Sequence, residues 1–310
     1  MLTWQERQQG LLPPSSRRTL ALLRGLEPGP RRWLATRYLR YRPLAPALER
    51  ELVEEIDRCW ESGSLPVSRA ALVDEVRLLA LLEAVQARAA QCAGPVATGR
   101  YLKLSSLAPI EELLDCDGRV MLLTPSFGPW QVIAPALARR GYRVGLLDLR
   151  PPHRRPPQSH APGPGLDLLR LPVRGYARPL VQFCRGPRTV VVAVGDEGCG
   201  LRWAHAPFLG RSAAIGATPF ELARLAEMRI LPVFALSEPL GNRLLIERPL
   251  RPALAAGGDR LAGLDGVAAR WLKIVEKLVR RYPAHYTAQL FQRRRQRHQD
   301  PMPLFGDVDS

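Results

Sequence analysis

The stretch that most constrains the fold of this chain runs from Arg119 to Gln131. Six residues of strand type, Arg-Val-Met-Leu-Leu-Thr, lead directly into the turn Pro-Ser-Phe-Gly-Pro and a Trp-Gln pair. A short apolar run that ends at proline and glycine predicts a buried strand, and Pro129 suits the first position of a helix. Ligands of open α/β sheets bind at the carboxyl ends of the strands. We therefore expect residues 125–131 to border a functional site.

From residue 119 onward, short apolar runs alternate with segments of helical periodicity. This pattern predicts an α/β fold with a mixed, mostly parallel sheet that helices cover on both faces. We expect strands at 119–124, 143–149, 188–194, 229–235 and 243–247, and helices at 129–140, 176–185, 216–227 and 259–281.

The chain divides into three parts by pattern. Residues 1–100 are predicted to form a helical N-terminal extension, with helices at 46–60 and 68–90 and Ser68 as the N-cap of the second. Residues 101–298 form the α/β domain, in which the proline-rich segment 150–165 is predicted to be a long loop over one sheet edge. Residues 299–310 are expected to be a flexible tail.

The N-terminal extension mixes aromatic residues with arginine, including Trp4, Trp33, Arg37 and Tyr38. Such a segment suits the surface of an anionic bilayer, with its aromatic rings at the depth of the headgroups. A solvated arginine-rich leader followed by an ordinary helix accounts for the same residues, as does a solvated basic run for Arg293–Arg295. Both interpretations stay open.

The net charge of +16 and the pI of about 10.7 point to an anionic partner, such as a membrane surface, a phosphorylated substrate or nucleic acid. Only three of the 45 basic residues are lysine, which leaves 42 arginines, and this bias with 30 prolines is typical of a GC-rich genome. Nucleic acid is the least supported of these partners because the sequence has no helix-turn-helix, zinc or aromatic-basic module.

The sequence predicts neither a membrane span nor a secretory signal, and its cysteines suggest a cytosolic setting. No run of about 18 apolar residues predicts a spanning helix, and residues 1–10 lack the apolar run of a secretory signal. Five scattered cysteines without C-x-x-C spacing are expected to be reduced thiols, and no metal site is predicted.

Three blocks of the chain resemble the bacterial lipid A late acyltransferases, also called lauroyl/myristoyl acyltransferases, over roughly residues 100–295. The first block of that family, a strand followed by His-Phe-Gly-x-Trp-Glu, is similar to Leu122–Gln131 here, with Phe127, Gly128 and Trp130 in register. The second, a strand ending in Asp-Gln, is similar to Val190–Val194 followed by Asp196-Glu197. The third is similar to Pro207–Arg211, with its Phe208 and Gly210, followed by the helix and strand around Leu222 and Leu231.

The resemblance implies a glycerolipid acyltransferase-like fold and transfer of a fatty acyl chain to a lipid hydroxyl. The donor would be an acyl carrier protein or coenzyme A thioester, without a further cofactor, and the place would be the cytoplasmic face of the inner membrane. In the family, a histidine removes the hydroxyl proton and an acid five residues later orients it. Ser126 and Gln131 stand at these two positions here, and neither can supply that chemistry.

No histidine of the chain has an acid five residues after it, so a replacement base would have to come from elsewhere in the fold. His205, Asp196 and Glu197 are the residues to test, although Asp196-Glu197-Gly also suits an ordinary acidic turn. Ser126 itself could be an acyl-accepting nucleophile, or simply the cap of the helix that follows.

The remaining candidates would bind substrate. Arg150 and Arg211 could hold phosphate groups through charge-assisted hydrogen bonds, although solvated surface arginines are the commoner case. Phe127, Gly128, Trp130, Phe208 and Gly210 follow the family blocks, although Phe127 and Trp130 also suit simple packing of a helix on the sheet. The predicted function is therefore acyl transfer with an altered catalytic set. The alternative is a catalytically silent relative that binds an acyl chain or carrier protein and supports a partner enzyme.

Overall fold

The computed structural model describes most of the chain between residues 17 and 287. The described residues are 17–43, 46–60, 65, 67–93, 95–104, 106–148, 165–170, 178–196, 202–252 and 260–287. Predictions for Arg150, Glu197, most of the 150–165 segment, the basic run 293–295 and the tail 299–310 lie outside them.

The described part of the chain contains a mostly parallel sheet of seven strands, which confirms the predicted α/β fold. Its strand order is β1-β9-β8-β2-β5-β3-β4, and only the β8–β9 pair is antiparallel. The strands are β1 (Leu102–Lys103), β2 (Arg119–Thr124), β3 (Arg143–Asp148), β4 (Leu166–Arg170), β5 (Thr189–Val194), β8 (Arg229–Glu238) and β9 (Gly241–Ile246).

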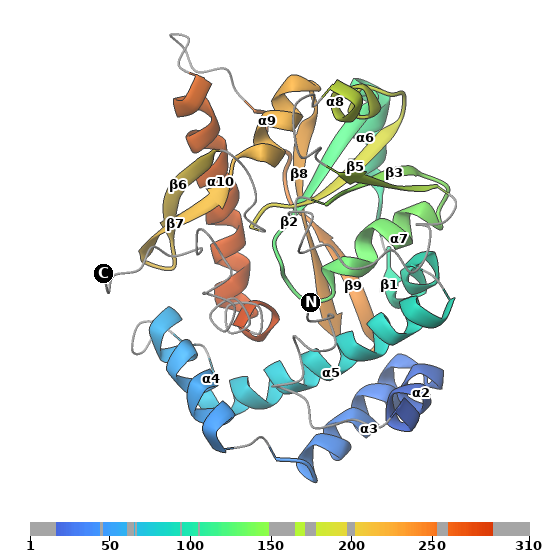
Figure 1. Ribbon diagram of the computed structural model, residues 1–310, viewed down its shortest axis with the longest axis vertical. Helices are drawn as coiled ribbons and strands as arrows, with labels where there is room; N and C mark the ends of the chain where they lie inside the picture. Colours follow the sequence, from blue (N-terminus) through green and yellow to red (C-terminus); the bar gives the residue numbers. More distant parts are fainter. Residues whose placement is uncertain are drawn as a thin grey trace.

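Both faces of this sheet are apolar, because successive side chains of a strand point to opposite faces. In β2, Val120 and Leu122 join one buried cluster, whereas Met121 and Leu123 join another. Helices α6 (Ala108–Asp117) and α7 (Ile133–Ala138) pack in the first cluster. The second holds α8 (Arg178–Cys184), α9 (Thr218–Leu225) and α10 (Arg260–Arg281), and Figure 1 shows α9 and α10 on the side of the sheet opposite α6 and α7.

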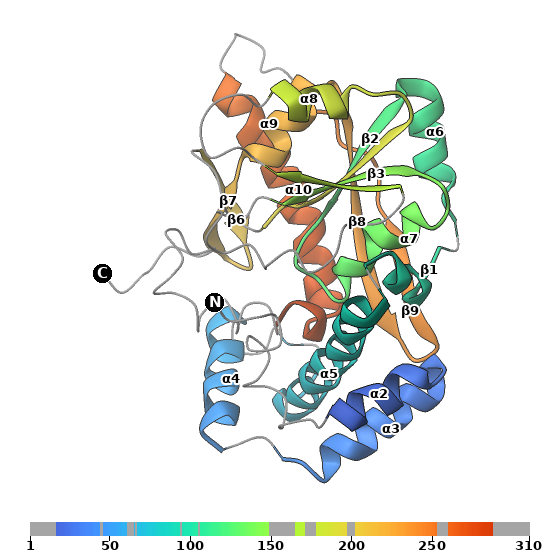
Figure 2. The same cartoon turned by 45° about the vertical axis from the view of Figure 1, so that its right-hand side comes forward.

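The N-terminal helices lie together at one end of the sheet, as Figures 1 and 2 show. Helices α4 (Pro46–Cys59) and α5 (Arg69–Ala93) confirm the predicted pair, and the Ser68 hydroxyl accepts a hydrogen bond from Ala71 N–H at 3.3 Å as an N-cap does. Two helices in the arginine-rich segment, α2 (Arg17–Gly25) and α3 (Pro28–Arg40), pack on α5 through a third apolar cluster.

The helix predicted over 129–140 is shorter and begins differently. A 3-10 turn, η2 (Trp130–Val132), precedes α7. Pro135 explains the difference because it has no N–H to donate to the carbonyl of Gln131, so an α-helix cannot extend back through that residue.

A two-stranded hairpin, β6 (Trp203–Phe208) and β7 (Arg211–Gly216), packs on α10 beside the main sheet. Its two turn residues, Leu209 and Gly210, have φ angles of 52° and 78°, as a tight turn between twisted strands requires. The backbone N–H of Leu209 donates to Glu276 Oε2 at 3.2 Å, which ties the turn to α10.

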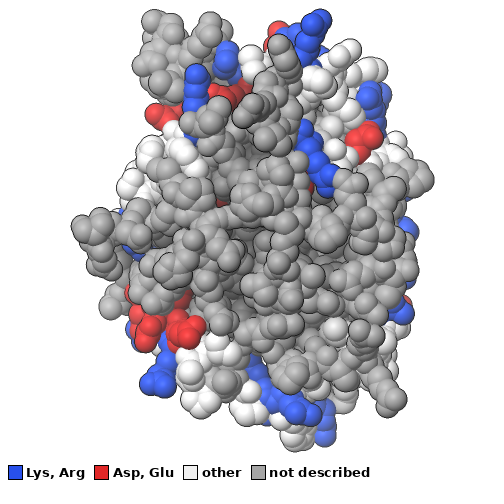
Figure 3. Space-filling model, viewed as in Figure 1, with Lys and Arg blue, Asp and Glu red and all other residues white. Residues whose placement is uncertain are grey.

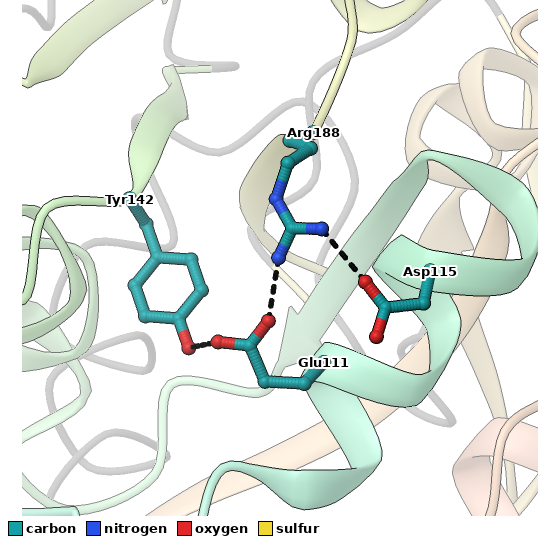
Figure 4. A network of polar contacts seen from close by, with 4 residues as sticks. All are labelled: Glu111, Asp115, Tyr142 and Arg188. Atoms are coloured by element: carbon teal, nitrogen blue, oxygen red, sulfur yellow. Dashed lines mark hydrogen bonds and ion pairs between the residues drawn. The ribbon is translucent and has the colours of Figure 1, made fainter.

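A polar network links α6 to the start of the central strands, at the edge of the sheet opposite the candidate site (Figure 4). Arg188 donates to Glu111 and to Asp115, both at 2.7 Å, and the Tyr142 hydroxyl donates to the other oxygen of Glu111. Burial and the Glu111 carboxylate raise the pKa of Tyr142 to about 12. The amino ends of β3 and β5 are therefore joined to α6 by polar contacts. The carboxyl ends of the parallel strands hold the buried carboxylate described next.

Candidate active site

Ser126 and Asp196 meet at the carboxyl edge of the sheet. Strands β2 and β5 are parallel neighbours in which Thr124 pairs with Val194, so the residues two positions further along each strand lie side by side. Asp196 Oδ1 accepts hydrogen bonds from the Ser126 backbone N–H at 2.8 Å and from its hydroxyl at 3.1 Å. Each of the two residues is only 2% exposed. The first and second blocks of the resemblance are therefore joined directly.

Tyr286 completes the binding of this carboxylate. Its hydroxyl donates to Asp196 Oδ2 at 2.8 Å, and its ring packs edge-on against Phe208 with the centroids 5.7 Å apart. Tyr286 follows the end of α10, and Phe208 belongs to the third block of the resemblance. At least three donors thus hold the Asp196 carboxylate, as a buried anion requires. We name Ser126, Asp196 and Tyr286 the Asp196 cluster.

His285 lies beside this cluster and is held at both ends. Its ring stacks on Phe127 with the centroids 5.1 Å apart, its carbonyl accepts from Gly128 N–H, and its Nε2 accepts from Ser237 N–H, both at 2.9 Å. Burial, together with the positive charge of Arg32, lowers the pKa of His285 to about 4. The imidazole is therefore neutral at pH 7 with its proton on Nδ1, and Nε2 is not free to act as a base.

Gly128 fits a position that a larger residue cannot take. Its φ angle is +52°, and a Cβ atom there would lie 2.8 Å from His285 Cδ2 and would overlap the carbonyl oxygen of Ala235. The glycine of the first block thus lets the turn after β2 approach β8 and the segment after α10. Its role in this structure is close packing.

The other predicted site residues are placed as follows. Phe127 is fully buried against Phe234, and Trp130 is half-buried against the α7 side of the sheet. Gln131 lies in η2, half-buried, and its side chain makes no hydrogen bond to another described residue.

His205 is exposed on β6 opposite Ala214 and does not bond to the Asp196 cluster. Gly210 is exposed in the hairpin turn and Arg211 is half-buried beside it.

Sequence reasoning missed His285, Tyr286 and Ser237. The search for an acid five residues after each histidine could not find them, because Tyr286 and Asp196 are 90 positions apart. The only local signal was a His-Tyr pair that follows Pro283 at the end of a long amphipathic helix. Only the folded chain brings these side chains to the sheet edge.

Metal ligands do not cluster in the described part of the chain, where no group of three or more His, Cys, Asp or Glu side chains could hold an ion. Of the cysteines whose side chains are described, Cys116 is exposed, and the buried Cys184 has its pKa raised to about 12 by burial. A thiol with such a pKa is not a nucleophile near neutral pH.

No protein-family model matches this chain, and no curated protein matches it in a sequence search. The structure itself defines the class: an α/β protein with a mostly parallel sheet and a buried carboxylate cluster at its carboxyl edge.

Proposed function

We propose that this chain is an acyltransferase-like protein that takes a fatty acyl chain from an acyl carrier protein or coenzyme A thioester. The acceptor is a hydroxyl of a lipid or glycolipid at the inner membrane. The observation that carries the proposal is that three separate blocks of the resemblance meet at one corner. Ser126 of the first block bonds to Asp196 of the second, and Tyr286 connects Asp196 to Phe208 of the third.

In this proposal Asp196 takes the place of the missing histidine. An acceptor hydroxyl replaces the Ser126 hydroxyl as donor to Asp196 Oδ1 and gives up its proton as its oxygen attacks the thioester carbonyl carbon. The carbon–sulfur bond breaks, and the leaving thiolate takes the proton back from Asp196, which leaves an ester and a thiol. General acid–base assistance of this kind contributes about 10²- to 10⁴-fold to a rate.

The test is discharge of a radiolabelled acyl carrier thioester onto lipid by the purified full chain. Asp196→Asn should lower the rate by about a hundredfold or more, whereas Gln131→Ala, which removes a side chain without a described bond, should leave it unchanged. Thermal unfolding of both variants shows whether the Asp196 variant is folded. Absence of turnover by the unaltered chain, on every acceptor lipid tested, would contradict transfer.

A second candidate is a catalytically silent relative that binds an acyl chain or carrier protein for a partner enzyme. One observation favours it: the Asp196 carboxylate already has at least three donors, and Ser237 occupies His285 Nε2. The double variant Ser126→His/Gln131→Glu discriminates the two. A silent protein with an intact binding site should gain activity, whereas a working site should lose it, and Gln131→Glu alone is the control.

Peripheral attachment to the membrane is part of the proposal. No helix in the described ranges is long and apolar enough to cross a bilayer. Trp33 on α3 and Leu240 in the β8–β9 turn are 63% and 71% exposed and border one shallow depression. Arg37 stacks on the Trp33 ring at 5.7 Å, and Figure 3 shows basic side chains along the lower edge of the molecule, over α3. Exposed aromatic and aliphatic groups among arginines suit an anionic bilayer surface.

A further inference from the structure

A cavity of about 400 Å³ lies where the N-terminal helices meet the β8–β9 hairpin, and no residue of the Asp196 cluster is among the described residues that line it. Its walls come from α2, α3, α5, the end of η1 (Pro95–Tyr101), β1, and both strands of the β8–β9 hairpin. Figures 1 and 2 show these elements gathered at the lower end of the sheet. Its volume falls within the range of small-molecule sites.

The lining of this cavity is strongly basic. Among the described residues that line it, five are cationic and two, Glu27 and Glu238, are acidic. The cationic residues are Arg24, Arg31, Arg32, Arg100 and Lys103. Glu238 is already paired with Arg243 Nη2 at 2.7 Å, and Glu27 is exposed. The acids of the wall therefore do not balance its positive charge.

Two of the guanidinium groups lie against the same aromatic ring. Arg31 and Arg100 lie 4.9 Å and 5.0 Å from the centroid of the Tyr101 ring, and Arg100 Nη2 also donates to the Tyr101 hydroxyl at 3.0 Å. Arg31 is buried, and it donates to the backbone carbonyls of Leu23 and Leu26 rather than to a carboxylate. Burial lowers the pKa of Arg31, and the charge of Arg100 adds to this effect.

Arg32 is a further cation of the wall. Its Nη2 bonds to Glu75 at 3.2 Å, while its Nη1 is shielded from solvent and has no hydrogen-bond partner among the described residues. Two buried amides, Gln86 and Asn242, also line the cavity. An anion in the cavity would supply the negative charge that the acids of the wall do not.

We infer that this cavity binds a phosphomonoester group. A dianion with three terminal oxygens suits a cavity lined by several guanidinium groups, which recognise phosphate through charge-assisted hydrogen bonds. A carboxylate would leave more of the charge unbalanced. This site is separate from the acyl-transfer proposal and does not require it. One wall residue, Ser237, donates its N–H to His285, so the cavity and the Asp196 cluster are structural neighbours.

The phosphomonoester can come from a soluble molecule or from a lipid headgroup. Arg32 borders both this cavity and the exposed depression with Trp33 and Leu240, so a headgroup at a docked membrane surface would lie close to it. The experiment therefore has two arms. Titration calorimetry of the full chain uses inorganic phosphate, glycerol 3-phosphate and adenosine 3′,5′-bisphosphate. Flotation uses phosphatidylcholine vesicles with phosphatidic acid, or with phosphatidylglycerol of equal total charge.

The variant Arg100→Gln/Lys103→Gln removes two cations of the wall. Its matched control, Arg248→Gln/Lys273→Gln, removes two exposed cations elsewhere. Loss of charge-assisted contacts should weaken phosphomonoester binding about tenfold or more in the first pair, and the control pair should bind like the unaltered chain.

Binding in calorimetry identifies a soluble source, and binding only to phosphatidic acid vesicles identifies a lipid source. The inference is overturned if no phosphomonoester binds in either arm, or if both pairs of substitutions weaken binding equally. Preference for phosphatidylglycerol over phosphatidic acid would also overturn it. Thermal unfolding confirms that both double variants are folded, and none of these readouts depends on acyl transfer.

Discussion

The hydroxyl of Ser126 donates a hydrogen bond to the carboxylate of Asp196 across 70 positions of sequence, with 3.1 Å between Oγ and Oδ1. Because the backbone N–H of Ser126 binds the same oxygen, the carboxylate fixes the turn after β2 as well as the side chain. Asp196 therefore has a structural role at the carboxyl ends of β2 and β5, whatever chemistry it performs. The stability of each variant of the Asp196 cluster must be measured before its activity is interpreted.

Tyr286→Phe should destabilise the protein without a change of shape. It removes one hydrogen bond to a buried carboxylate, which contributes about 1.5–3 kcal/mol to the free energy of unfolding. Urea denaturation followed by circular dichroism measures the loss. Tyr41→Phe is the matched control, since Tyr41 is 72% exposed. Equal midpoints for the two variants would show that the Tyr286 hydroxyl contributes nothing.

His285 should make the protein sensitive to mild acid. Its pKa is lowered to about 4 in the folded chain, so between pH 6.5 and 4 the unfolded chain binds more protons than the folded one. Stability should therefore decrease as the pH falls through this window, by about 3 kcal/mol in total.

The measurement for His285 is the unfolding free energy against pH for the unaltered chain, His285→Gln and His205→Gln. His205→Gln is the matched control, because His205 is exposed on β6. A profile of His285→Gln parallel to that of the unaltered chain would refute this assignment.

Gly128→Ala should be far more damaging than Gly118→Ala. Both glycines have positive φ, 52° and 69°, which costs an L-residue about 1–2 kcal/mol. A Cβ at position 118 meets nothing within 4 Å, whereas at 128 it strikes the Ala235 carbonyl and His285. The difference between the two midpoints in thermal denaturation thus reports the close contact, and equal losses would mean that the turn after β2 moves freely.

Tyr142 should ionise at a higher pH than an ordinary tyrosine. Burial and the Glu111 carboxylate raise its pKa to about 12, so its phenol contributes stability that is present below pH 10 and lost as the pH rises toward 12. Ultraviolet titration of the unaltered chain minus Tyr142→Phe isolates its transition. Glu111→Gln should move that transition downward, and an unchanged transition would exclude Glu111 as a cause.

The exposed pair Trp33 and Leu240 should carry membrane attachment. Trp33→Ser/Leu240→Ser removes apolar area that would enter the interface, so vesicle affinity should fall by roughly tenfold or more. Flotation with phosphatidylglycerol vesicles measures it. The control is Val67→Ser/Leu225→Ser, two exposed apolar residues outside this surface. Equal retention of both variants on vesicles would place attachment elsewhere.

The local pattern of apolar residues was sufficient to predict the central strands of the sheet. Runs such as Val190–Val194 are buried on both faces, so their apolar character is continuous and visible in a short window. The pattern was less informative for α2 and α3, because arginines are frequent in both helices and few of their apolar residues are fully buried. The buried ones are Leu20, Leu23, Ala35 and Leu39. The hairpin turn at Leu209-Gly210 was also missed, since leucine rarely takes a positive φ.

The candidate site also has one part that the sequence predicts and another part that only the tertiary structure determines. The sequence alone showed that Ser126 and Asp196 each follow a buried strand. Parallel neighbouring strands end on the same side of a sheet, so residues at equal distances beyond two such strands lie close together. Tyr286 on Asp196, His285 on Phe127 and the arginines around Tyr101 come from segments far apart in the chain, and side-chain packing alone brings them together. Such contacts depend on how helices and strands pack on one another, and no local window contains that information.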